Sequence, residues 1–181
     1  MARVPTYIAF LRAINVGQRK FAKGAIVQAC EEAGCTDVAT YINTGNVRLT
    51  TSLRSRAKVE GALEKAFAAA AGFEVPTIVF TPKELSAVAA HADEMAAGHG
   101  GLLYVSLLKD APTAAATKKL DGAGKEGERA EVRGRAAFLL LGDDYHSAKL
   151  SNAVVEKHLG VATNRNVKVI RTLAEKWGDG G

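Results

Sequence analysis

The sequence is poor in the residues that mark several specialised protein classes. Only 2 of its 181 residues are cysteine, which excludes a disulfide framework. No apolar run approaches the ~18 residues that a membrane-spanning helix needs. The first residues lack the long apolar core of a signal peptide. With 48% hydrophobic residues the chain can still bury a core, so we expect a globular, cytoplasmic protein.

Acidic residues are missing from the beginning of the chain. The net charge is +5, and the first acid is Glu31. Residues 1–81 contain 10 Lys and Arg against 6 Asp and Glu, a net charge of +4. Such an excess favours an anionic partner such as a phosphate or a nucleotide, although an ordinary mildly basic surface would look the same.

The first half of the chain alternates strand and helix patterns without leftover segments. Apolar runs, turn residues and helix-terminating glycines predict strands over 4–14, 37–43, 47–50 and 74–80 and helices over 22–33 and 52–71. Pro76 indicates that the last of these strands lies at a sheet edge. The order β-α-β-β-α-β predicts a ferredoxin-like half over residues 1–81.

The second half, residues 82–177, repeats part of this order. Thr81, Pro82 and Glu84 have the spacing of a capping box and predict a new helix. Further along, the patterns predict strands over 102–108, 130–133 and 136–142, and helices over 110–120, 147–159 and 164–177. We therefore predict an α+β protein of two ferredoxin-like halves in tandem, the second with its last strand replaced by a helix. Residues 178–181 are expected to be a frayed tail.

The topology of the first half brings two polar segments together. Strands one and two of a split β-α-β unit run in the same direction, so the loop after strand one and the hairpin after strand two emerge at the same end of the sheet. This argument predicts one ligand-binding site formed by two groups of residues: Asn15, Gly17, Arg19 and Lys20 from the loop, and Asn43, Thr44, Gly45 and Asn46 from the hairpin.

The chemistry of that end fits an anion. The loop leads into a helix N-terminus, which offers free N–H groups and partial positive charge. Arg19 could bind a phosphate or carboxylate with two donors, and the asparagines could hold an oxyanion or a water. The alternative interpretation is structural: the glycines make turns, the asparagines bond their own backbone, and Arg19 and Lys20 are solvated.

Other candidate sites are less well supported. Asn164 and Arg165, at the expected start of the last helix, form a secondary anion-site hypothesis, with simple helix capping as the alternative. Asp143, Asp144 and His146 match no metal motif, and we predict neither a metal nor a cofactor.

Three segments carry a resemblance to a known family: YIAFLRAINVG (7–17), TDVATYINTGNV (36–47) and AKLSNAVVEKHLGVATNRNVKVIRTLAE (148–175). Together they resemble the bacterial domain-of-unknown-function family DUF1697. The resemblance implies a compact α+β protein without an assigned activity. The chain departs from the family pattern at Ala13 and Gln18, where glycine is usual, and at Asn43-Thr44, where Gln-Ser is usual.

We therefore predict a binding module for a small anionic ligand of phosphate or nucleotide type. The alternatives are an acylphosphatase-like hydrolase, by fold analogy, and a protein-interaction or weak nucleic-acid-binding module. Base stacking of the RRM kind is not favoured, because Tyr7 and Phe10 point to opposite faces of their strand, so any nucleic-acid binding would be non-specific. The sequence leaves open the ligand, the reaction and the oligomeric state.

Overall fold

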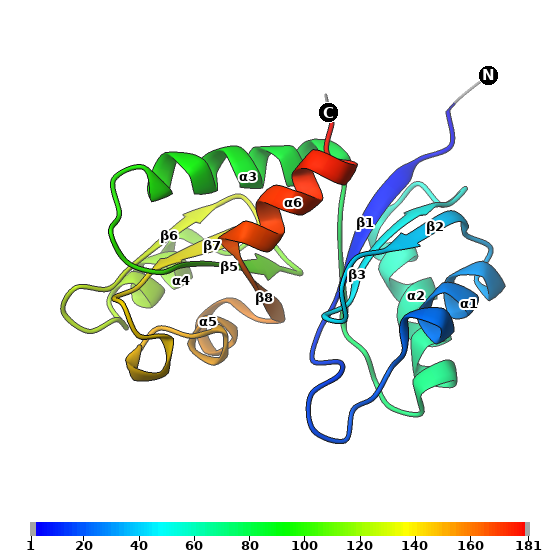
Figure 1. The fold of residues 1–181 in the computed structure, drawn as a ribbon, viewed down its shortest axis with the longest axis horizontal. Coiled ribbons are helices and arrows are strands. Elements are labelled where there is room, and N and C mark those ends of the chain that lie inside the picture. The colour runs from blue at the N-terminus through cyan, green and yellow to red at the C-terminus, as the bar shows by residue number, and fades with distance from the viewer. Residues whose placement is uncertain (1–2, 180–181) are drawn as a thin grey trace. The chain divides into compact units, whose positions relative to one another are not determined.

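The computed structural model describes residues 3–179 and divides into two compact units (Figure 1). Unit 1 extends to Glu84 and unit 2 begins at Leu85. Each unit contains one four-stranded antiparallel sheet. Within the described part of the chain, no helix is both long and apolar enough to cross a membrane.

Unit 1 has the predicted order of elements. Its elements are β1 (Thr6–Leu11), α1 (Lys23–Glu32), β2 (Thr36–Thr40), β3 (Asn46–Thr50), α2 (Arg56–Ala71) and β4 (Thr77–Phe80). The strands lie in the order β2-β3-β1-β4, so β4 is an edge strand, as Pro76 indicated. Because β1 and β2 both run antiparallel to β3, they point the same way, which is the arrangement on which the predicted site depends.

The central strand β1 is apolar on both faces. Tyr7, Ala9 and Leu11 pack into the core that α1 and α2 form over the sheet. Ile8 and Phe10 alternate with them and are also fully buried, with Phe10 edge-on to Phe80. Burial on both faces explains why the strand is a continuous apolar run without the alternation of a half-exposed strand.

Unit 2 repeats the strand order of unit 1 and contains one strand more than predicted. After α3 (Pro82–Ala96) come β5 (Leu103–Leu108), α4 (Ala114–Asp121), β6 (Arg129–Arg133), β7 (Ala136–Leu140), a short 3-10 helix η1 (Tyr145–Ser147), α5 (Asn152–Leu159), β8 (Ala162–Asn166) and α6 (Val167–Trp177). The sheet order is β6-β7-β5-β8.

The α+β class with two similar halves is therefore confirmed, and both halves are consistent with a ferredoxin-like fold. The predicted replacement of the last strand by a helix is wrong. Residues 162–166 form β8, which pairs with β5, and α6 is an additional element after it. The helix prediction fails here because the strand carries polar side chains, Asn164 and Arg165 among them. These are hydrogen-bonded within unit 2 and do not alternate with apolar ones.

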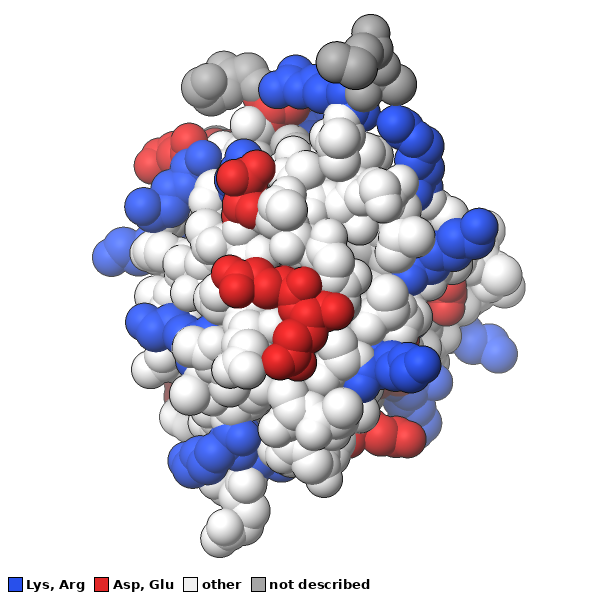
Figure 2. Space-filling model, turned by 90° about the vertical axis from the view of Figure 1, so that its right-hand side faces the viewer, with Lys and Arg blue, Asp and Glu red and all other residues white. Residues whose placement is uncertain are grey.

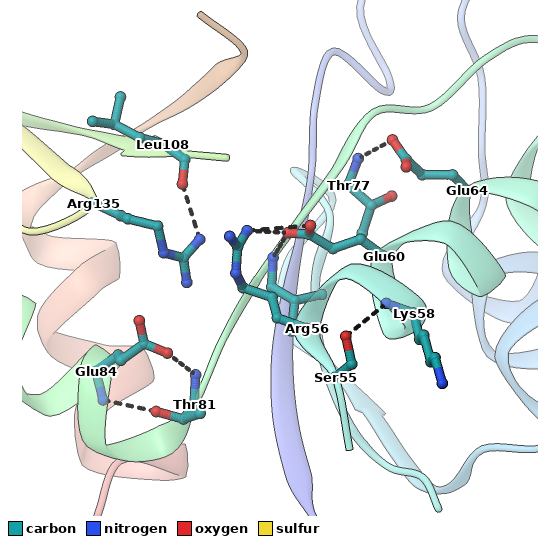
Figure 3. Close-up of polar contacts among 11 residues, drawn as sticks. Ser55, Arg56, Lys58, Glu60, Glu64, Thr77, Thr81, Glu84, Leu108 and Arg135 are labelled. Atoms are coloured by element: carbon teal, nitrogen blue, oxygen red, sulfur yellow. Dashed lines mark hydrogen bonds and ion pairs between the residues drawn. The ribbon is translucent and has the colours of Figure 1, made fainter. Parts of the chain in front are cut away.

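Side-chain caps set where the helices begin. The predicted capping box is confirmed: Thr81 and Glu84 each accept a backbone N–H from the other at 3.1 Å (Figure 3). Helix α2 is capped by Ser55 and begins at Arg56 instead of at residue 52, and α5 is capped by Ser151 and begins at Asn152 instead of at residue 147. At the other end of the chain, the Asp179 N–H donates to Ser86 Oγ at 2.9 Å, and the rest of the tail predicted to be frayed, 180–181, lies outside the described residues.

Candidate functional site

The loop after β1 closes on itself before α1 begins. The Asn15 N–H donates to Arg19 O at 2.6 Å, and the Arg19 N–H donates to Val16 O at 3.0 Å. The turn between them contains Gly17, whose φ is +55° and whose surroundings are open. Gly17 thus has the turn role that the structural interpretation assigned to it.

Asn15 joins this loop to the hairpin between β2 and β3. Its side-chain amide donates to Asn43 O at 2.7 Å and to Phe21 O at 3.1 Å, and its Oδ1 accepts the Phe21 N–H at 3.0 Å. The two polar segments that topology placed at one end of the sheet are therefore in direct contact. Asn15 fixes both of them relative to the residues that lead into α1.

Arg19 is held by the protein itself. Its Nε donates to Ala13 O at 2.6 Å and one Nη donates to Glu74 O at 2.7 Å. Its guanidinium lies 4.3 Å from the centre of the Phe73 ring, a cation–π contact. Because two of its donors are used on carbonyls, Arg19 binds the loop to the segment before β4. These two donors are not available for the two hydrogen bonds to a phosphate or carboxylate that the sequence suggested.

The hairpin turn is tightly packed against the loop. The Leu11 N–H donates to Gly45 O at 2.9 Å, and Gly45 has a φ of +84°. A Cβ at Gly45 would lie 2.7 Å from Leu11 Cβ, so only glycine fits. Asn46 is fully buried, and its amide donates to Tyr41 O at 3.0 Å and Thr44 Oγ1 at 2.9 Å. Gly45 and Asn46 therefore build the turn, while Asn43 and Thr44 are exposed.

Two residues with a left-handed backbone flank the site. Ala13 has a φ of +56° and Ile42 a φ of +50°. Such values are uncommon for residues with a Cβ and are a genuine outlier for β-branched isoleucine. The conformation of Ala13 explains why glycine suits this position in the family that the sequence resembles.

Helix α1 begins beside this loop without a side-chain cap. Ala22 occupies the N-cap and makes no side-chain hydrogen bond, and the first turn contains no acidic residue. Lys20 and Lys23 flank it and are exposed. The helix start therefore combines an uncapped first turn and partial positive charge with two exposed lysines next to it in the chain. The site predicted from the sequence includes Lys20 but not Ala22 or Lys23, although an alanine at the start of a predicted helix is a sign of a missing cap.

The two residues of the secondary anion-site hypothesis, Asn164 and Arg165, lie in unit 2. Asn164 and Arg165 belong to β8, and the cap of α6 is Asn166, which accepts the Val169 N–H at 2.9 Å. The Asn164 amide donates to Ser106 Oγ at 3.3 Å. Arg165 is 6% exposed, and burial lowers its pKa to about 10; its Nη1 donates to Thr163 Oγ1 at 2.8 Å and Asn164 O at 2.9 Å.

The aromatic residues of β1 are not available for base stacking. Tyr7 is 6% exposed and Phe10 is 0% exposed. Figure 2 shows a face of the molecule on which Lys and Arg side chains are scattered between uncharged surface, around a compact acidic group, without a continuous basic stripe. Across residues 3–179, no group of three His, Cys, Asp or Glu side chains is arranged to hold a metal ion.

Comparison with known proteins places the chain in a family. The model of "Protein of unknown function (DUF1697)" matches residues 4–138. The chain belongs to the DUF1697 family. This DUF1697 protein matches no curated protein.

The fold of this DUF1697 protein has a solved counterpart. The structure described as that of the conserved bacterial protein SP0830 from Streptococcus pneumoniae has 18% sequence identity to it and a TM-score of 0.71. The match covers 97% of this chain and 99% of that one. At this identity the similarity concerns the fold alone.

Proposed function

We propose that the loop and hairpin end of unit 1 binds a small anionic ligand of phosphate or nucleotide type, in the bacterial cytoplasm. The observation that carries this proposal is the uncapped start of α1 at Ala22, between the exposed Lys20 and Lys23. An anion placed there would accept the free N–H groups of the first turn and be attracted by the helix dipole and both ammonium groups.

The surrounding contacts support a preorganised binding site. Asn15 ties the loop to the hairpin and to Phe21, directly before the helix. Arg19 ties the same loop to Glu74 O. In this proposal Asn15 and Arg19 hold the backbone, while Lys20, Lys23 and the amides of α1 contact the ligand. Gly17, Gly45 and Asn46 shape the two turns, and the exposed Asn43 and Thr44 form the rim.

The acylphosphatase-like alternative gains no support from these contacts. That chemistry needs an arginine that points at the phosphate and an asparagine that orients water. Arg19 points two donors at Ala13 O and Glu74 O, away from the exposed Asn43, which is the asparagine at the end of strand two. We therefore propose binding without a hydrolytic step.

The experiment measures thermal stability and calorimetric binding with inorganic phosphate, ADP, ATP and a dicarboxylate, at low and moderate salt. A ligand at 100 times its Kd should stabilise the protein by about 2.7 kcal/mol. The decisive variant is Ala22→Asp, which supplies the missing cap. It should stabilise the unliganded protein by about 1 kcal/mol and abolish the stabilisation by phosphate compounds, because its carboxylate occupies the same N–H groups.

The double variant Lys20→Ala with Lys23→Ala should also lose binding, whereas Lys65→Ala, an exposed lysine on α2, should keep it. A ligand whose stabilising effect survives Ala22→Asp binds elsewhere and would refute the proposed site. If any polyanion raises the unfolding temperature and moderate salt removes this effect, the loop has a purely structural role.

A further inference from the structure

The edge strand β6 of unit 2 has backbone groups that point away from its sheet. Arg133 of β6 and Ala136 of β7 flank a two-residue turn and therefore form a hydrogen-bonded pair. In the alternate positions of β6, Ala130 and Val132 direct their N–H and C=O groups away from β7. The Ala130 N–H does point away from β7, because it donates to Asp121 Oδ1 of α4 at 3.4 Å. The next outward-facing residue is Val132.

Two of the other sheet edges are covered by side chains. On β4, the outward N–H of Thr77 donates to Glu64, as Figure 3 shows, and that of Val79 donates to Glu60. On β8, the Ala162 N–H donates to Glu156 and its C=O accepts from Asn152.

The remaining edge, β2, carries a register irregularity between Thr36 and Ala39, and irregular pairing of this kind blunts a sheet edge. On β6, by contrast, no side chain in residues 3–179 bonds the outward groups of Val132. β6 is therefore the edge at which strand addition meets least obstruction.

A groove of about 720 Å³ runs along this edge. Helix α4 and the segment before it form one wall, and β6 forms the other. Small residues line much of it, among them Ala111, Pro112, Ala114 and Val132, and the charged residues Lys118, Asp121, Glu131 and Arg133 line the rest. Such a groove leaves room for a further extended strand beside β6.

The charged side chains of β6 indicate which strand can pair with it. Its other face carries Arg129, Glu131 and Arg133, with Glu131 Oε1 3.5 Å from Arg129 Nη2 and Oε2 3.7 Å from Arg133 Nη2. If a second β6 pairs antiparallel so that the two copies of Val132 are opposite each other, each Glu131 lies opposite an Arg133. Opposite charges in directly facing positions stabilise a sheet, and like charges destabilise it.

The neighbouring registers are less favourable. Shifting the pair to centre on Glu131 places glutamate opposite glutamate and Arg129 opposite Arg133. Centring it on Ala130 restores complementary charges but uses the Ala130 N–H, which already donates to Asp121. The register centred on Val132 therefore places each Glu131 opposite an Arg133 and also uses the open backbone groups of Val132.

We propose that β6 is a dimerisation edge, at which a second copy of this chain adds its own β6 antiparallel through Val132. The two four-stranded sheets of unit 2 then continue into one sheet of eight strands across a two-fold axis. The pairing is isologous, as a symmetric dimer requires.

Sedimentation equilibrium of the full chain over a wide concentration range tests the proposal. The wild-type protein should show a reversible monomer–dimer equilibrium. Val132→Pro removes the outward N–H, which an edge strand tolerates, and should weaken the dimer at least tenfold. Circular dichroism and thermal unfolding of the variant confirm that the monomer stays folded.

A charge exchange provides the specific test. Glu131→Arg alone and Arg133→Glu alone should each be monomeric, since each places like charges opposite each other. Mixing the two variants should restore a dimer that contains one copy of each, because the opposing charges are then complementary. A wild-type protein that stays monomeric at millimolar concentration overturns the proposal, as does a dimer that is unaffected by Val132→Pro or a mixture that fails to associate.

Discussion

The carboxylate of Glu60 accepts the backbone N–H of Val79 at 2.9 Å, and this contact joins helix α2 to the outer side of β4. One turn further along α2, Glu64 accepts the Thr77 N–H at 3.2 Å (Figure 3). The spacing matches because four helical residues rise about 6.0 Å and two strand residues about 6.6 Å. Two glutamates thus cover the edge of the sheet without another strand.

Removal of the buried carboxylate should destabilise unit 1. Glu60 is 3% exposed and is also bonded by Arg56 at 3.2 Å. Glu60→Ala takes away the acceptor of a buried N–H and the partner of an arginine, so we expect a loss of about 2–3 kcal/mol in the free energy of unfolding. Urea denaturation measures it, with the exposed Glu31→Ala on α1 as a control expected to change stability by less than about 0.5 kcal/mol. Equal effects of the two substitutions would contradict the role of Glu60.

Two glycines with positive φ should respond differently to alanine. Gly45→Ala must fit a Cβ 2.7 Å from Leu11 Cβ at a φ of +84°, and should cost about 2–4 kcal/mol through combined overpacking and strain. Gly17→Ala meets no atom within 4 Å and should cost only the strain, about 1–2 kcal/mol. Thermal unfolding of both variants tests the difference; a Gly17 variant that is the less stable of the two would show that the hairpin contact is misjudged.

Glu128 should make the stability of unit 2 dependent on pH. The carboxylate accepts backbone N–H groups from Lys149 at 3.0 Å and Leu150 at 3.0 Å. Although burial acts to raise the pKa of Glu128, these bonds, together with that from Lys125 and its charge, outweigh it and lower the pKa. Because the folded pKa lies below the unfolded one, the stabilisation is fully present above the unfolded pKa and is lost as the pH falls through the folded value.

The test of this prediction compares wild type with Glu128→Gln between pH 3 and pH 7. At neutral pH the variant should be less stable by about 1–2 kcal/mol, since it loses charge-assisted hydrogen bonds. The gap should close as the pH falls. A gap that stays constant through this range would mean that the Glu128 carboxylate does not titrate differently in the folded state.

The two cysteines should be inert in the folded protein. Burial, and then the charges of Cys35 and Glu31, raise the pKa of Cys30 to about 12, and burial raises the pKa of Cys35 as well. Since the thiolate is the reactive form, a thiol reagent at pH 8 should modify neither residue until the protein is unfolded. Above about pH 8.5 the thiols ionise more readily in the unfolded chain, so stability should fall as the pH rises. Fast modification of the native protein would refute the assignment.

The site illustrates how far topology alone reaches. The direction of β1 and β2 placed the loop and the hairpin together, and the bond from Asn15 to Asn43 O joins them. The partners of Arg19 could not be predicted, because Glu74 lies 55 residues further along the chain and is held near only by the folding of α2 and β4. Local patterns contain no information about which carbonyls an arginine reaches.

The sequence by itself determined the class of the protein, the order of elements in unit 1 and the shared end of its sheet, because periodic burial of apolar side chains is a local property of the chain. The tertiary structure decided the rest. It showed that β8 is a strand although Asn164 and Arg165 interrupt any apolar alternation, and that Glu60 and Glu64 cover one sheet edge while β6 stays open. These features depend on hydrogen bonds between segments distant in sequence, and only the packed chain brings their donors and acceptors together.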